Sequence, residues 1–321
     1  MIDTTHFPKA KKYWHMGKFY DWSEAHVHPM SFALHYGGSV FEGIRAYLTP
    51  KGPAVFRLPE HVDRLFHSAS VAKMTVPYSQ EEIIKAIKLT VRKNKLQSAY
   101  IRPLLFYSYG NLGLRPKYCP VELLIGVWEW EAYLGHKTEK GVSVYILPQR
   151  RIHYSQMDMT AKLGGIYIQS TICALDARSL GFDEGVFLNL EGNIAEGPGE
   201  NIFIVQGKRI KTNDKSESIL EGITRTSILE IAKDHGYKTV IGPITKEEFF
   251  KADEAFFSGT AAEIAPIVQI TDGSNPKAPK KEYIVGTGRV GETTRRLKKV
   301  FKEIVTGKTS RYQKWLTPLS D

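Results

Sequence analysis

The sequence has little cysteine. Only Cys119 and Cys173 occur among its 321 residues, too few and too far apart for a disulfide framework or a thiolate metal site. His26 and His28 could share one face of a strand, but no third ligand lies near them. We therefore expect no bound metal and a location in the reducing cytoplasm.

Long apolar runs are also missing. No uninterrupted hydrophobic run approaches the roughly 20 residues that span a bilayer. The segment Met1–Lys18 is polar and aromatic, unlike the apolar core of a signal peptide. The sequence therefore predicts no association with a membrane.

Acidic residues are outnumbered. The 44 lysines and arginines exceed the 34 aspartates and glutamates, which gives a formal net charge of +10. Such a surplus is compatible with nucleic-acid binding, which is the remote alternative for this chain. The basic residues are scattered, however, with short clusters only at Lys9–Lys12 and Arg295–Lys299. We interpret them as solvated surface and expect no nucleic-acid partner.

The length suggests about two domains, and the 42% hydrophobic content is that of an ordinary globular protein. Strand-like composition stops at Glu131 and resumes at Val142. This break predicts a small N-terminal α/β domain over 1–130, a linker over 131–141 and a larger C-terminal domain over 142–321.

Hydrophobic spacing and capping signals predict the main elements of both domains. Helices are expected over 58–74, after the capping box at Ser79, over 168–180, after the capping box at Thr245 and over 290–304. Strands are expected over 98–107, 121–130, 186–189, 194–196, 201–205 and 254–259.

One lysine stands out in the C-terminal half. Lys162 follows Met-Thr-Ala and precedes Leu-Gly-Gly, and Tyr167 lies five residues further on. Apolar surroundings lower the pKa of an amine and make it a nucleophile, as in a Schiff-base lysine. The glycines allow a bulky group to approach closely. The ordinary alternative is a surface lysine before a Gly-Gly turn.

Three further motifs fit a lysine that binds a phosphorylated ring. Glu196 enters a stiff Gly-Pro-Gly turn and could hold a proton on a ring nitrogen. Gly222-Ile223-Thr224-Arg225 begins a helix, whose unpaired amides and hydroxyl suit a phosphate. Ser258-Gly259-Thr260-Ala261 offers a second hydroxyl-bearing turn. Alone, each motif is common. Glu196 could be an acidic turn residue in water, and Thr224 could simply cap the helix.

With these motifs, the chain resembles the fold-type IV pyridoxal-phosphate enzymes, and among them the branched-chain amino acid aminotransferases. The resemblance runs from about Lys18 to about Ile304. The stretches that carry it are the Lys162 stretch, His35-Tyr36-Gly37-Gly38-Ser39-Val40-Phe41-Glu42-Gly43-Ile44-Arg45, Glu60-His61-Val62-Asp63-Arg64-Leu65, Tyr100-Ile101-Arg102-Pro103, Glu196–Asn201, Gly222–Arg225 and Phe257–Glu263.

The resemblance implies a two-domain α/β fold with mixed sheets and with pyridoxal 5′-phosphate between the domains. Lys162 would bond to the cofactor aldehyde and move the proton of the reaction, with Tyr167 on the ring hydroxyl and Glu196 on the pyridine nitrogen. The phosphate would be bound by Arg64, Ile223, Thr224 and Thr260.

The resemblance also implies the substrate contacts and the reaction. The substrate carboxylate would meet Tyr100 and the amides of Thr260 and Ala261, and Arg102 would bind the distal carboxylate of glutamate. An apolar side-chain pocket would be lined by Tyr36, Phe41, Trp130 and Tyr133. The expected reaction transfers the amino group of leucine, isoleucine or valine to 2-oxoglutarate.

The resemblance leaves alternative activities open and implies an oligomeric state. Other fold-type IV activities, namely D-amino acid or amine transamination and aminodeoxychorismate cleavage, are the nearest alternatives. The resemblance implies a homodimer or a dimer-based homo-oligomer, in which Leu114 reaches the partner subunit.

Overall fold

The computed structural model describes residues 6–130 and 137–320. Within them the chain forms two compact units. Unit 1 comprises 6–130, 161–166 and 303–320, and unit 2 comprises 137–160 and 167–302. The sequence alone assigned 161–166 and 303–320 to the C-terminal domain. They join unit 1 through pairing with distant residues, such as Leu316 with Phe56.

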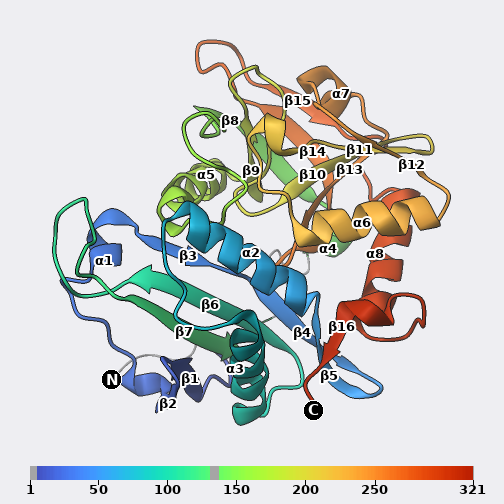
Figure 1. Cartoon of the computed structure of the whole chain (residues 1–321). Coiled ribbons are helices and arrows are strands. Elements are labelled where there is room, and N and C mark those ends of the chain that lie inside the picture. Colours follow the sequence, from blue (N-terminus) through green and yellow to red (C-terminus); the bar gives the residue numbers. More distant parts are fainter. Residues whose placement is uncertain (1–5, 131–136, 321) are drawn as a thin grey trace. The chain divides into compact units, whose positions relative to one another are not determined.

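Unit 1 is built on an eight-stranded sheet in which every pairing is antiparallel. The strands run in the order β16-β5-β4-β6-β7-β1-β2, and β3 pairs with β6 (Figure 1). Their bounds are β1 Lys12–His15, β2 Lys18–Asp21, β3 Ser39–Phe41, β4 Ile44–Thr49, β5 Gly52–Phe56, β6 Ala99–Tyr107, β7 Val121–Trp128 and β16 Leu316–Pro318.

The two long helices of unit 1 bury their apolar faces in its core, whereas a short one leaves Leu34 and Tyr36 exposed. The helices are α1 Phe32–Tyr36, α2 Leu58–Val71 and α3 Gln80–Lys93. Helix α3 begins at the predicted capping box, in which Ser79 and Glu82 exchange hydrogen bonds. Leu58, Val62 and Leu65 of α2 are fully or almost fully buried in the core. The predicted helices and strands of this unit are therefore confirmed, within the shift of a few residues usual at element ends.

Unit 2 carries a second eight-stranded sheet, which is mixed. Its order is β12-β11-β10-β13-β14-β8-β9, with β15 on β14, and its parallel pairs are β11–β12, β14–β8 and β8–β9. The bounds are β8 Val142–Arg150, β9 Glu184–Leu188, β10 Asn201–Gln206, β11 Arg209–Thr212, β12 Lys238–Ile241, β13 Glu254–Gly259, β14 Glu263–Asp272 and β15 Lys281–Ile284. The α/β class with mixed sheets is confirmed.

The helices of unit 2 follow the predicted pattern except for α4, which was not predicted. They are α4 Lys137–Lys140, α5 Tyr167–Ser179, α6 Ile223–Asp234, α7 Lys246–Phe250 and α8 Glu292–Val305, the last of which extends into the residues of unit 1. Helix α7 starts at the predicted capping box of Thr245 and Glu248. The part of the expected linker that the structure describes contains α4.

One predicted strand is wrong. Residues 194–196 form only isolated bridges, from Ile194 to Leu188 and to Ile244. The Gly-Pro-Gly turn follows at once, which leaves no room for a longer ladder.

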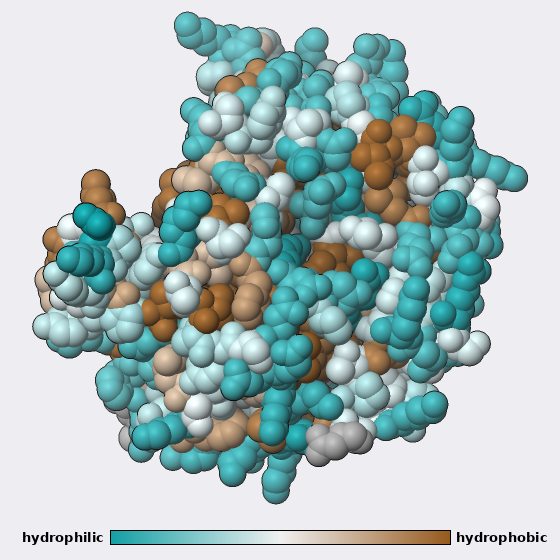
Figure 2. Space-filling model, in the orientation of Figure 1, coloured by the Kyte–Doolittle hydropathy of each residue, from teal (hydrophilic) through white to brown (hydrophobic). Residues whose placement is uncertain are grey.

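No helix in the described ranges is long and apolar enough to cross a bilayer. Figure 2 shows a face that is mostly hydrophilic and is interrupted by separate hydrophobic patches.

Candidate active site

The backbone around Lys162 is held by unit 1. The Lys162 carbonyl accepts a hydrogen bond from the Phe41 amide (3.2 Å), and its own amide donates to Ser68 Oγ (2.9 Å). A Cβ atom at Gly164 would lie 2.1 Å from Ser39 Oγ. The first glycine after the lysine is therefore required by the close approach of the β3 strand.

The Lys162 amine lies among rings and cations. Its Nζ is 4.8 Å from the centre of the Phe41 ring. Burial, helped by the positive charge of Arg64, lowers the pKa of Lys162 to about 8. The sequence predicted an amine shielded from water in this stretch, and the burial of Lys162 agrees with that prediction. At neutral pH a fraction of the amine is therefore unprotonated and nucleophilic.

Arg64 belongs to a buried charge cluster that the sequence did not reveal. Glu42, between β3 and β4, is fully buried and accepts hydrogen bonds from Arg64 Nε (2.6 Å) and Nη2 (2.9 Å). His61 Nδ1 donates to the same carboxylate (2.7 Å). The carboxylate and the guanidinium thus form a bidentate pair inside unit 1.

Next to this cluster lies an aromatic group around Arg102. The guanidinium of Arg102 is 4.5 Å from the ring centre of Phe41, and its Nη2 donates to the hydroxyl of Tyr100 (3.0 Å). The Tyr100 ring contacts Trp128 and Trp130, at 5.0 and 4.4 Å between centres. Arg102 Nε is buried and has no hydrogen-bond partner among the described residues. Such a donor is suited to an incoming carboxylate.

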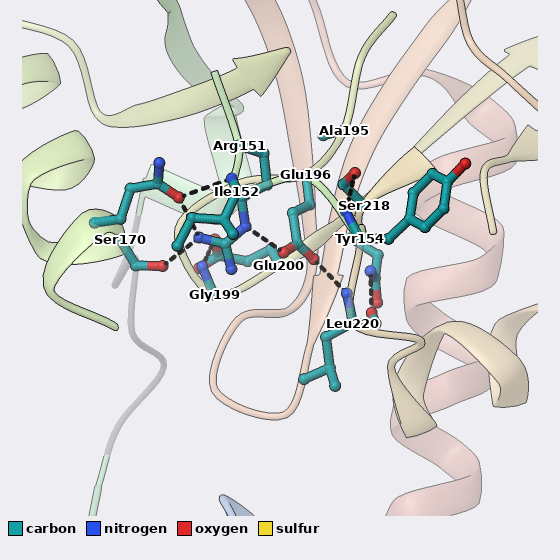
Figure 3. Close-up of polar contacts among 12 residues, drawn as sticks. Arg151, Ile152, Tyr154, Ser170, Ala195, Glu196, Gly199, Glu200, Ser218 and Leu220 are labelled. Carbon is teal, nitrogen blue, oxygen red and sulfur yellow. Dashed lines mark hydrogen bonds and ion pairs between the residues drawn. The ribbon is translucent and has the colours of Figure 1, made fainter. Parts of the chain in front are cut away.

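Unit 2 carries a second group, centred on Glu196. Its Oε1 accepts from Arg151 Nε (3.0 Å) and its Oε2 accepts from the Leu220 amide (3.1 Å). Figure 3 shows the two side chains pointing at each other, with Ser170 beside the guanidinium. Arg151 and Glu196 are 3% and 5% exposed, so this ion pair is buried. The guanidinium and the Leu220 amide thus fix the position of the carboxylate.

Asn201, the first residue of β10, fastens the loop before α6. Its Nδ2 donates to the Leu220 carbonyl (2.7 Å), and its Oδ1 accepts from the Gly222 amide (3.0 Å). A Cβ at Gly222 would lie 2.3 Å from that Oδ1. The approach of Asn201 therefore explains the glycine before the helix, and it fixes the N-terminus of α6 close to the Glu196 carboxylate.

The same corner of unit 2 contains the second hydroxyl-bearing turn. Asn201 pairs with Ser258 across β10 and β13, and Thr260 and Ala261 follow in the turn to β14. Ser258 Oγ is buried and has no hydrogen-bond partner within the described part of the chain. Glu196, the start of α6 and this turn are thus neighbours in one unit.

The structure therefore brings the predicted residues together as two groups. Unit 1 assembles Lys162 with the predicted residues Arg64, Phe41, Tyr100, Arg102 and Trp130. Unit 2 assembles Glu196 with Ile223, Thr224, Thr260 and Ala261, and it also contains Tyr167, the first residue of α5.

Thr224, Tyr36 and Tyr133 do not join these two groups as simply as the others. Thr224 does not cap α6, because the N-cap is Gly222 and Thr224 is the buried second residue of the helix. Tyr36 is 47% exposed on α1, where its ring contacts Phe32 rather than an apolar pocket within unit 1. Tyr133 lies outside the described residues.

Sequence reasoning also missed the partners that position these groups. Glu42, His61 and Arg151 were not selected, although Glu42 lies in an otherwise apolar strand region and Arg151 directly follows a buried strand. A charged residue at such a place must find a partner, which was the available signal.

Comparison with known proteins gives consistent results over nearly the whole chain. Residues 39–270 match the family described as amino-transferase class IV. The chain is 43% identical over 305 residues to a branched-chain-amino-acid aminotransferase of Pseudomonas aeruginosa, covering 95% of this chain and 96% of the relative. It is 39% identical over 310 residues to the enzyme of that name from Escherichia coli K12, covering 96% and 97%.

Solved structures agree with this assignment. The T.th. branched-chain amino acid aminotransferase, complexed with N-(5′-phosphopyridoxyl)-L-glutamate, superposes with a TM-score of 0.90 at 40% identity, covering 98% of this chain and 100% of that one. The Escherichia coli enzyme gives a TM-score of 0.91 at 38% identity, covering 97% and 100%. On these grounds, the chain belongs to the class IV aminotransferases.

Proposed function

We propose that the protein is a pyridoxal-phosphate-dependent branched-chain amino acid aminotransferase, which transfers the amino group of L-leucine, L-isoleucine or L-valine to 2-oxoglutarate. The observation that carries this proposal is the Lys162 amine, whose pKa is lowered to about 8. The relatives named above, at 39–43% identity over almost their whole length, support the choice of substrates.

The residues of both units fit pyridoxal phosphate. In unit 1, an amine nucleophile lies beside Arg64, which suits a phosphate. In unit 2, the start of α6 lacks a side-chain cap from its N-cap residue, and the Ser258 hydroxyl, which has no partner among the described residues, lies near Thr260. The buried Glu196 carboxylate suits a protonated ring nitrogen. These are the complementary groups for an amine-reactive aldehyde, a phosphate and a pyridine.

In this proposal Lys162, Tyr167 and Glu196 are the catalytic residues. When bound, the cofactor supplies an electron-withdrawing ring that stabilises negative charge at the substrate α-carbon. Lys162 Nζ would hold the cofactor aldehyde and, once the substrate amine has displaced it, would be free to take the α-carbon proton, while Tyr167 would contact the ring hydroxyl. Glu196, held by Arg151 and the Leu220 amide, would keep a proton on the ring nitrogen.

The binding residues follow from the same two groups. Arg64, Ile223, Thr224 and Thr260 would hold the phosphate. Tyr100 and the amides of Thr260 and Ala261 would bind the substrate carboxylate. The side-chain pocket would be lined by Tyr36, Phe41, Trp130 and Tyr133.

Arg102 explains how one pocket could accept two kinds of side chain. Its guanidinium lies over the Phe41 ring and is tied to the Tyr100 hydroxyl. A branched alkyl group would pack on the rings, whereas the distal carboxylate of glutamate would satisfy the buried Nε. An arginine that can be used or bypassed therefore suits both substrates of the reaction.

A panel of amino donors tests this function. Purified protein with pyridoxal phosphate and 2-oxoglutarate should form glutamate from L-leucine, L-isoleucine and L-valine. D-leucine, D-alanine and primary amines should give little product. Activity confined to the D-amino acids or the amines would replace the proposal with another activity of the same fold type.

We also propose that the protein is a cytoplasmic homodimer. Helix α5 exposes Ile168, Ile172 and Leu175, spaced for one helix face, at 64%, 47% and 61%. Leu114 is 85% exposed. Such an apolar stripe favours burial against a second copy. Light scattering after size-exclusion chromatography should give twice the 36.3 kDa chain mass, and a monomer would contradict the assembly.

The proposed cytoplasmic location rests on the cysteines. Both are buried free thiols, which supports a reducing compartment.

A further inference from the structure

Among the described residues of unit 1, the Glu42 carboxylate is the least accessible charged group. It is 0% exposed, and it lies in an apolar region between Phe41 and Ile44. Taking a charge out of water is costly, and a well-packed apolar replacement is often as stable as a buried ion pair. Stability alone therefore does not account for a carboxylate at this position.

Both oxygens of this carboxylate are used in a fixed arrangement. Oε1 accepts from Arg64 Nε, and Oε2 accepts from Arg64 Nη2, from His61 Nδ1 and, at 3.2 Å, from the amide of Gly43. The bonds come from α2, which carries His61 and Arg64 one turn apart, and from the backbone that follows β3. The carboxylate is thus held from two directions.

The charge states of the cluster follow from its contacts. Burial alone would raise the pKa of the Glu42 carboxyl, but the Arg64 charge and the His61 hydrogen bond hold that pKa well below its ordinary value. Burial lowers the pKa of His61, against the raising effect of Glu42. At neutral pH the cluster therefore contains an ionised carboxylate, a neutral imidazole that donates through Nδ1 and the guanidinium.

The side-on pairing with Glu42 fixes the guanidinium plane. Arg64 uses Nε and Nη2 on one edge for the carboxylate, so the direction of the edge that carries Nη1 is set by Glu42. The Arg64 side chain is 13% exposed, whereas the Glu42 side chain is 0% exposed. The same arginine influences the charge of Lys162.

We infer that Glu42, anchored by His61, is a positioning residue that orients Arg64 toward the cofactor phosphate. The inference rests on the proposed function, because it requires Arg64 to face that phosphate. Glu42 itself touches neither the cofactor nor the substrate in this account. It acts by holding an otherwise flexible guanidinium in one orientation, which lowers the conformational cost of phosphate binding.

The test compares two aldehydes, pyridoxal phosphate and unphosphorylated pyridoxal. Both can react with the Lys162 amine, but only the first has a phosphate for Arg64. The ratio of their dissociation constants for the apoprotein, measured by absorbance titration, therefore isolates the phosphate contribution. Glu42→Gln should lower this phosphate preference by about tenfold or more, the effect of a lost charged hydrogen bond.

Matched variants separate positioning from general damage. Glu60→Gln makes the same chemical change on the same helix, at a side chain that is 39% exposed, and should leave the ratio unchanged. In an Arg64→Ala background, Glu42→Gln should have no further effect on the ratio. His61→Phe, which removes the anchor while filling its space, should lower the ratio less than Glu42→Gln does, and it provides the test if Glu42→Gln fails to fold.

The outcomes are distinct. An equal loss of affinity for both aldehydes, or no loss for either, would overturn the positioning role, as would an unchanged ratio in His61→Phe. Unmutated apoprotein that binds neither aldehyde would instead contradict the proposed function itself.

Discussion

Breaking the buried ion pair of Arg151 and Glu196 from one side should destabilise unit 2. The two side chains are 3% and 5% exposed, and Nε lies 3.0 Å from Oε1. At an effective dielectric constant of about 20, Coulomb's law gives an attraction of about 5.5 kcal/mol at 3.0 Å. Removing one partner of such a pair costs about 3–5 kcal/mol, because the other charge is left buried.

We therefore expect Arg151→Met to lower the free energy of unfolding of the apoprotein by about 3–5 kcal/mol. Glu196→Gln and the double variant Arg151→Met/Glu196→Gln complete a double-mutant cycle. The double variant should lose less than the sum of the single variants, by at least about 2 kcal/mol, because it contains no uncompensated charge.

Urea unfolding followed by far-ultraviolet circular dichroism measures these differences. Lys251→Met is the control, because Lys251 forms an ion pair with Glu247 in which both side chains are more than 70% exposed. Its midpoint should stay close to that of the unmutated protein. A loss below about 1 kcal/mol in Arg151→Met, or strict additivity in the cycle, would show that no buried charge is left uncompensated when one partner is removed.

Three further predictions concern individual contacts. The rate at which Lys162 reacts with an amine-specific reagent should be half-maximal near pH 8. Arg64→Gln should move this midpoint to higher pH, because it removes a nearby cation. An unmoved midpoint would show that the Arg64 charge does not lower the pKa of Lys162. Gly43→Ala should weaken L-leucine binding, measured as a raised KM, because its Cβ would lie 2.2 Å from the Tyr100 hydroxyl. Asn201→Ala should accelerate hydrogen exchange at the start of α6, since two backbone groups lose their partner; unchanged exchange there would show that the loop is held by other contacts.

Local patterns predicted most of the fold. The helix over 58–74 and the capping boxes at Ser79 and Thr245 are local signals, and α2, α3 and α7 formed where they indicated. The membership of 161–166 and 303–320 in unit 1 was not predictable in this way. It depends on pairings such as Val40 with Leu163, between residues far apart in the sequence.

The candidate site likewise contains residues with a local sequence signal and residues whose role depends on distant partners. Lys162, Glu196 and the Gly222–Arg225 turn carry local signatures, because reactive amines and anion-binding turns require particular neighbours. Their supporting partners carry none. Glu42 meets Arg64 from 22 residues away, and Arg151 meets Glu196 from 45 residues away. Only the folded chain reveals such contacts, because many buried charges and many partners are possible in a sequence of this length.

Lys162 is the amine that we expect to hold the cofactor. Reduction of the loaded protein with sodium borohydride fixes a lysine–cofactor bond, and peptide mass spectrometry then locates it. The account predicts a phosphopyridoxyl group on the peptide that contains Lys162, lost in Lys162→Ala. The group on any other lysine, or its persistence in that variant, would contradict the account.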